Sequence, residues 1–139
     1  MIVYFDASAL VKLLVEEDGT EVAIDRWDGC DAAASSRLAY PEVRAALAAA
    51  ARDGRLAAAD LDRAEGEWEG YWSEVAQVEL TPNVARAAGD LVRTHALRGA
   101  DAVHLASALV LRTADLVVAA WDRRVKAGAI AEGLSVAPA

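Results

Sequence analysis

Four acidic residues lie at points where the chain passes from one expected element of secondary structure to the next. Asp6 and Asp122 each follow a short apolar run that is typical of a buried strand. Glu42 and Asp101 each lie near the start of an expected helix, where the helix dipole tolerates negative charge. Taken alone, each acid is equally typical of a helix cap or a solvated surface charge.

Together, the four acids predict a metal site. Carboxylates held within about 4–6 Å of one another repel, raise one another's pKa values and destabilise the fold unless a cation compensates them. Oxygen ligands without a histidine or thiolate partner favour Mg²⁺ or Mn²⁺ over zinc. Mg²⁺ keeps several of its waters in such a site, which leaves room for a phosphate and an attacking water. This chemistry is typical of phosphodiester hydrolysis by a metal-activated water.

The order of the expected elements explains how acids distant in sequence would meet. Strands and helices alternate along the chain, which predicts an α/β domain with a parallel sheet. In such sheets the ligand site is the crevice outside the carboxyl ends of the strands. The expected strands are 2–5, 31–35, 77–80, 116–119 and 134–136. The expected helices are one capped by Ser8, a segment through 22–27, the ranges 37–53, 57–74, 82–99 and 101–113, and a short helix after Asp122.

Length and composition narrow the class of protein. The chain has 139 residues, which fits one domain, and its only cysteine cannot form an internal disulfide. Neither a signal peptide nor a membrane-spanning apolar stretch is evident, so we expect a cytoplasmic protein without membrane association. The formal charge of −8 argues against nucleic-acid binding. It is compatible with such binding only where the acids gather around a cation.

Four segments carry a family resemblance. In chain order they read FDASALVKLL, YPEVRAAL, GADAVHLASAL and WDRRV. The set resembles the PIN-domain nucleases, and specifically the VapC toxins of bacterial and archaeal toxin–antitoxin pairs. The resemblance covers essentially the whole chain and implies a single PIN domain, 1–139, with a three-layer α/β/α fold around a central parallel sheet. Asp6, Glu42, Asp101 and Asp122 match the acidic quartet of this family one by one.

The resemblance also implies an activity and partners. It implies an endoribonuclease that cleaves RNA and acts as the toxin of a type II toxin–antitoxin pair, working as a homodimer and silenced by a cognate antitoxin. Asp6 and Asp101 would hold a first Mg²⁺ or Mn²⁺. Glu42 and Asp122 would complete the cluster and bind a second ion when substrate arrives. Nothing in the residues themselves identifies a 2′-hydroxyl, so RNA as the substrate comes from the resemblance alone.

Other positions match the family pattern unevenly. Ser8 matches a small hydroxyl residue two positions after the first acid, and Arg44 matches a basic residue after the glutamate. Many members carry threonine or serine two residues before the last acid, where this chain has Ala120 followed by Trp121. This departure leaves the geometry of the last acid open. It also leaves open an alternative function, a PIN-fold binding module for RNA or protein with weak or no nuclease activity.

Several aromatic side chains have two interpretations. Trp68, Tyr71 and Trp72 form a stripe at helical spacing. Core packing is the default for such a stripe, and the resemblance adds a groove for the antitoxin as an alternative. His104 lies three residues after Asp101 within an apolar helix, and we expect a core or interface histidine rather than a metal ligand.

The basic residues Arg123, Arg124 and Lys126 follow Asp122 directly. They are equally compatible with contacts to an RNA backbone and with a solvated helix face. Two rival α/β families fit less well. A receiver domain requires an acidic pair at the end of the first strand and a lysine after the last strand, and a haloacid-type phosphatase requires an aspartate where this chain has Ser8.

Overall fold

The computed structural model describes residues 1–139 and contains one sheet of five strands. Every neighbouring pair of strands is parallel, and the order across the sheet is β3-β2-β1-β4-β5. The first strand is therefore central, and the chain extends the sheet on one side before it crosses to the other. The strands are β1 (Ile2–Phe5), β2 (Ala32–Ser36), β3 (Ala76–Val78), β4 (Leu116–Ala119) and β5 (Ser135–Ala137).

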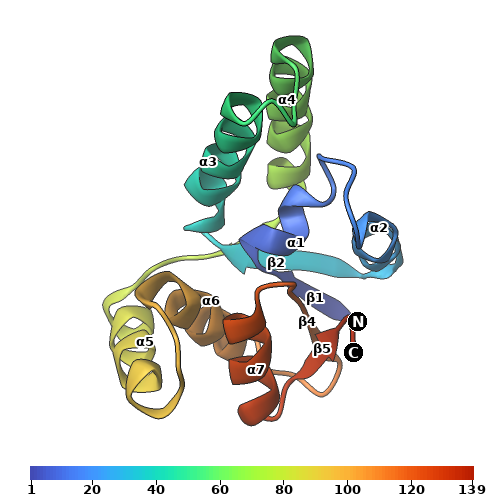
Figure 1. Cartoon of the computed structure of the whole chain (residues 1–139). Helices are drawn as coiled ribbons and strands as arrows, with labels where there is room; N and C mark the ends of the chain where they lie inside the picture. The colour runs from blue at the N-terminus through green and yellow to red at the C-terminus, as the bar shows by residue number, and fades with distance from the viewer.

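Seven helices cover the two faces of the sheet (Figure 1). One face carries α1 (Ala7–Val11), α2 (Thr20–Gly29), α3 (Ala39–Arg52) and α4 (Ala58–Glu74). The other carries α5 (Pro82–Thr94), α6 (Gly99–Val110) and α7 (Arg123–Ala131). The predicted three-layer α/β/α fold with a central parallel sheet is confirmed. None of the helices combines the length and the apolar character that crossing a bilayer requires.

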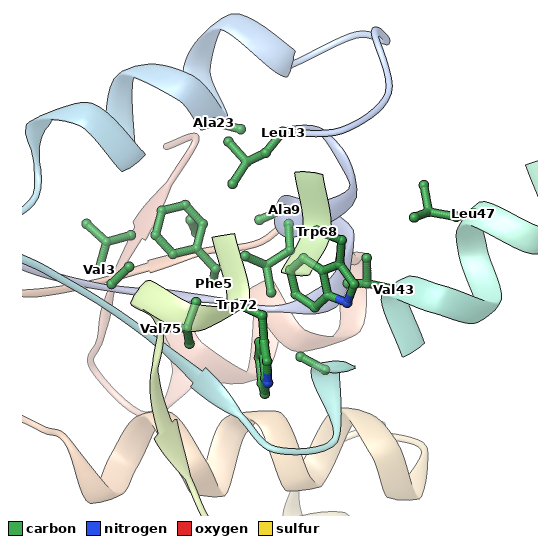
Figure 2. Close-up of a cluster of buried hydrophobic side chains, with 14 of the residues drawn as sticks. Val3, Phe5, Ala9, Leu13, Ala23, Val43, Leu47, Trp68, Trp72 and Val75 are labelled. Atoms are coloured by element: carbon green, nitrogen blue, oxygen red, sulfur yellow. The ribbon is translucent and has the colours of Figure 1, made fainter. Parts of the chain in front are cut away.

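The central strand explains why the sheet needs a helical layer on both faces. Val3 and Phe5 point into a core cluster beneath α1 to α4, whereas Tyr4 points into a second cluster beneath α6 and α7. All three side chains are fully buried. Figure 2 shows the first cluster, in which Val3 and Phe5 lie beside apolar side chains of the covering helices. An uninterrupted apolar run is what such a doubly covered strand requires.

The aromatic stripe of α4 packs in the core, as the default interpretation predicts. Trp68 is fully buried and Trp72 almost so (Figure 2). Their rings are 5.3 Å apart, and both contact the ring of Tyr40 from α3. Tyr71 packs edge-on against Trp27 of α2 at a centroid distance of 4.9 Å. The stripe therefore joins α4 to its neighbouring helices.

Three expectations about helix ends are wrong. Asp6, not Ser8, caps the first helix, because its side chain accepts a hydrogen bond from the backbone N–H of Ala9. The helix expected over 82–99 ends at Thr94, and the next helix begins at Gly99 rather than at Asp101. The sequence therefore predicts the break between these two helices, but places it a few residues too late. Asp101 consequently lies in the first turn of α6, with its side chain turned back toward the start of the helix.

Trp121 fixes the loop between α1 and α2. Gly19 lies there with φ +92°, a left-handed conformation that favours glycine. A Cβ atom at this position would be 2.6 Å from Nε1 of Trp121. On the same ring, the ammonium group of Lys12 lies 5.0 Å from the centroid. The bulky residue before Asp122 therefore packs against this loop.

Candidate active site

A cavity of about 270 Å³ opens beside the carboxyl ends of β1 and β4, and all four predicted acids line it. Asp6 directly follows β1, and its backbone N–H donates to the carbonyl of Ala119 at the end of β4 (3.1 Å). Asp122 follows three residues after β4, while α3 and α6 bring Glu42 and Asp101 to the same cavity. The order of the strands reverses at this point of the sheet, which is where open α/β sheets place their ligand sites.

Asp6 is a buried carboxylate with one unpartnered oxygen. Its Oδ1 accepts hydrogen bonds from the hydroxyl of Ser8 (2.6 Å) and the backbone N–H of Ala9 (3.0 Å), whereas its Oδ2 makes none. Only 2% of the residue is exposed. Burial raises the pKa of Asp6 to about 6, although the two hydrogen bonds oppose this shift. A cation in the cavity would stabilise the charged form of this buried carboxyl.

Asp101 is paired with Arg98 inside the same cavity. Its Oδ2 accepts from the backbone N–H (3.0 Å) and from Nε (3.1 Å) of Arg98, and its Oδ1 accepts from Nη2 (3.3 Å). Burial raises the pKa of the Asp101 carboxyl, but the hydrogen bonds and charge of Arg98 outweigh burial and hold the pKa below its usual value. The Nη2 group of Arg98 also donates to Oδ2 of Asp122 (3.2 Å). One guanidinium group thus links two of the four acids.

Ser8 holds the backbone at Asp122. Its Oγ accepts hydrogen bonds from the backbone N–H groups of Trp121 (3.0 Å) and Asp122 (3.2 Å) while donating to Asp6. Ala120 is fully buried in the core. Oδ1 of Asp122 caps α7, and Oδ2 reaches Arg98. The backbone of the last acid is therefore held by the residue that also contacts the first.

Glu42 is held by a buried histidine. Its Oε1 lies 2.5 Å from Nε2 of His104, and Nδ1 of His104 lies 2.8 Å from the hydroxyl of Tyr4. That hydroxyl already accepts a hydrogen bond from the backbone N–H of Ser36 (3.1 Å), so its own proton can be donated to Nδ1. A neutral His104 then carries its proton on Nε2 and donates it to Glu42. The expected core histidine is thus also a hydrogen-bond donor to the site.

His104→Leu should lower the free energy of unfolding by about 1–3 kcal/mol, because it leaves the buried hydroxyl of Tyr4 and one oxygen of Glu42 without this partner. Urea unfolding followed by circular dichroism measures the change. His104→Gln is the matched control, since its amide can still donate to Glu42, and it should lose less. Equal stability of His104→Leu and the unmodified chain would contradict this arrangement.

Other predicted residues lie away from the cavity. Arg44 points to α4, where it pairs with Glu65 (3.0 Å) and lies 3.7 Å from Glu69. Arg123 and Arg124 are exposed and line a neighbouring pocket. The structure therefore brings the acidic quartet together but not the basic residue after the glutamate.

Comparison with known proteins decides the family. The sequence matches the PIN domain over residues 3–130. It is 62% identical over 138 residues to ribonuclease VapC45 of Mycobacterium tuberculosis, a match that covers 99% of this chain and 96% of the relative. The chain belongs to the PIN-domain family of VapC ribonucleases. This membership confirms the resemblance carried by the four segments.

Solved structures of other proteins share the fold. PAE2754 from Pyrobaculum aerophilum superimposes with a TM-score of 0.68 at 26% identity, covering 98% of this chain and 92% of that one. A toxin–antitoxin complex from Klebsiella pneumoniae gives a TM-score of 0.64 at 20% identity, with 91% of each chain covered. The sheet with its two helical layers is therefore a PIN domain fold.

PIN-domain ribonucleases depend on a divalent metal ion, and the donor atoms of this cavity fit one. Four carboxylates line it, and the free Oδ2 of buried Asp6 lacks a cation partner. The arrangement is not preformed, however. No three histidine, cysteine, aspartate or glutamate side chains are grouped closely enough to hold one ion. Instead, Arg98 links Asp101 and Asp122.

Arg98 and His104 are the cavity residues whose part in the site the sequence did not reveal. Arg98 stands three residues before Asp101, a spacing at which oppositely charged side chains meet on a helix. That spacing was an available signal for the pair. The contact of His104 with Glu42 joins residues 62 positions apart, and no local pattern indicates it.

Proposed function

We propose that this VapC protein is an endoribonuclease toxin of a type II toxin–antitoxin pair, with Asp6, Glu42, Asp101 and Asp122 as its catalytic residues. In this proposal Asp6 and Asp101 hold a first Mg²⁺ or Mn²⁺, and Glu42 and Asp122 complete the site. The observation that carries the proposal is the buried Asp6 carboxylate, which faces three further acids in one cavity with an unpartnered oxygen. The proposed substrate is cellular RNA, which also places the protein in the cytoplasm.

Each residue of the site has a distinct part in this mechanism. The divalent ion supplies an activated water and offsets the charge of the phosphodiester when it is bound. Ser8 fixes the rotamer of Asp6 and the backbone of Asp122 through three hydrogen bonds. His104 orients Glu42 toward the cavity from the core side. These contacts hold three of the acids, which lie on separate elements of the fold.

The proposal includes an antitoxin partner and a homodimer. Trp72 of the aromatic stripe borders a largely apolar groove of about 480 Å³ with Leu38, Tyr40 and Pro41, and exposed Leu80 lies at its edge. Apolar side chains of an antitoxin peptide would fit such a groove. Trp68 lies in the core beneath it and is not available for contact. Support for a partner of this kind comes from the Klebsiella pneumoniae toxin–antitoxin complex that shares the fold.

The proposed activity is tested by incubating the purified protein with RNA under controlled metal. Cleavage should require Mg²⁺ or Mn²⁺, stop in EDTA, and return when the ion is added in excess. The unmodified chain should leave DNA of the same sequence uncut. Full RNA cleavage in EDTA would contradict the metal mechanism. Metal binding without any RNA cleavage would instead favour the alternative of a PIN-fold binding module.

A further inference from the structure

Arg98 is the only lysine or arginine on the wall of the carboxylate cavity. Its Nε and Nη2 groups donate to both oxygens of Asp101, and Nη2 also donates to Asp122. This guanidinium thus provides the positive charge that lies against Asp101 and Asp122. It uses the same carboxylate oxygens that a divalent ion would use.

The guanidinium group can leave these acids without disturbing the helix that carries it. The backbone of Arg98 is fixed separately as the N-cap of α6, since its N–H donates to Asp101 (3.0 Å) and its carbonyl accepts from Ala102 (3.0 Å). Its side chain is 64% exposed, compared with 6% for Asp101, and its Nη1 makes no hydrogen bond within the chain. Its side chain is therefore held only by the two acids and borders solvent.

We propose that Arg98 is the phosphate-binding residue of this site, and that it rests on Asp101 and Asp122 until a divalent ion takes its place. The inference rests on the proposed function. Four carboxylates repel an incoming phosphodiester, and a guanidinium fixed at the rim by its backbone is the group on the cavity wall that attracts one. Its planar set of N–H donors matches two phosphate oxygens. Metal binding and RNA binding are then coupled through this one side chain.

The first test measures metal affinity without RNA. Titration calorimetry with Mn²⁺ should show tighter binding to Arg98→Gln than to the unmodified chain, by about 3- to 10-fold, because the competing cation is gone. Arg124→Gln is the matched control. It removes a neighbouring positive charge that acts on Asp101 but has no hydrogen bond from its side chain to the acids. Unchanged or weaker binding by Arg98→Gln, or an equal gain in Arg124→Gln, would overturn the proposal.

The second test measures cleavage of a short RNA at saturating Mn²⁺. Arg98→Gln should lower kcat/KM by about 10-fold or more, chiefly through KM, because a charged hydrogen bond to phosphate is lost. Arg98→Lys should recover part of the loss, since it keeps the charge without the planar donors. Arg86→Gln, an exposed variant on α5, should behave like the unmodified chain.

Thermal melting of each variant shows whether it is folded. If Arg98→Gln is unstable, the comparison is made between Arg98→Lys and the unmodified chain. An unchanged kcat/KM in Arg98→Gln would overturn the assignment of Arg98 to phosphate. Failure of the proposed function looks different, because the unmodified chain itself would then not cleave RNA at any Mn²⁺ concentration.

Discussion

Asp101→Asn should reduce the rate of RNA cleavage by roughly 10²- to 10³-fold while the protein stays folded. The substitution removes a negative charge from the cavity but keeps an oxygen that can accept from the backbone N–H of Arg98. The start of α6 should therefore persist. Initial rates with a defined RNA at saturating Mg²⁺, together with a circular dichroism spectrum, measure both parts of the prediction.

Asp62→Asn is a suitable control for this experiment. Asp62 is an exposed residue of α4, on the opposite helical layer, and forms no ion pair. Its substitution lowers the net negative charge by the same amount and should leave the rate unchanged. A rate for Asp101→Asn within about threefold of the unmodified chain would show that Asp101 is not a metal ligand, since such a change is worth less than 1 kcal/mol of transition-state free energy.

Asp6→Asn should make the metal-free protein more stable at pH 7. Burial raises the pKa of Asp6 to about 6 in the folded protein, above the ordinary value of 3.8. Between these two values the folded state holds a proton that the unfolded state has lost, so stability from this group falls as pH rises from about 4 to 6. Asparagine removes this cost, which amounts to about 2–3 kcal/mol at most. The stability gain should disappear toward pH 4.

Urea unfolding in EDTA at pH 4 and pH 7 measures the difference in free energy of unfolding between Asp6→Asn and the unmodified chain. The other acids titrate alike in both proteins, so their effect drops out of this difference. Added Mn²⁺ should reverse the order of stability at pH 7, because an ion that binds only the folded state stabilises the chain that retains Asp6. An Asp6→Asn variant that is less stable than the unmodified chain at pH 7 in EDTA would show that burial of the charged Asp6 carboxylate does not destabilise the fold.

The sequence predicted that the four acids lie close together, because the order of the strands and helices determines their positions. A continuous apolar run indicates a strand covered on both faces, and parallel strands bring their carboxyl ends to one edge of the sheet. Asp6 and Asp122 follow two strands that pair with each other, with Phe5 opposite Ala119. Their neighbourhood therefore follows from the order of the elements alone.

The hydrogen bonds inside the cavity could not be predicted in the same way. They depend on the rotation of α3 and α6 about their helix axes. The spacing of apolar residues shows which face of a helix is buried, but not which side chains on that face touch. Tyr4 and His104 are 100 residues apart and meet because one lies on the central strand and the other on the buried face of α6. The break between α5 and α6 was predicted too late in the chain, because α5 ends at Thr94 and α6 begins at Gly99, which makes Arg98 the cap residue beside Asp101.

The way in which Asp122 is held is a further feature that only the structure reveals. A missing hydroxyl two residues before Asp122 left the position of that acid open. The hydroxyl oxygen of Ser8, which follows the neighbouring strand β1, accepts hydrogen bonds from the backbone N–H groups of Trp121 and Asp122. No local sequence pattern indicates these contacts, because Ser8 lies 113 and 114 residues before its two partners.

In the proposed mechanism, the carboxylate cavity binds the catalytic metal ion. X-ray diffraction from crystals soaked in Mn²⁺, recorded where manganese scatters anomalously, tests it most directly. We predict an anomalous peak inside the cavity in contact with the Oδ2 atom of Asp6 and with Asp101, and a guanidinium of Arg98 that has moved off Asp101. A soaked crystal with Mn²⁺ bound elsewhere, and with Arg98 still linking Asp101 to Asp122, would contradict the account.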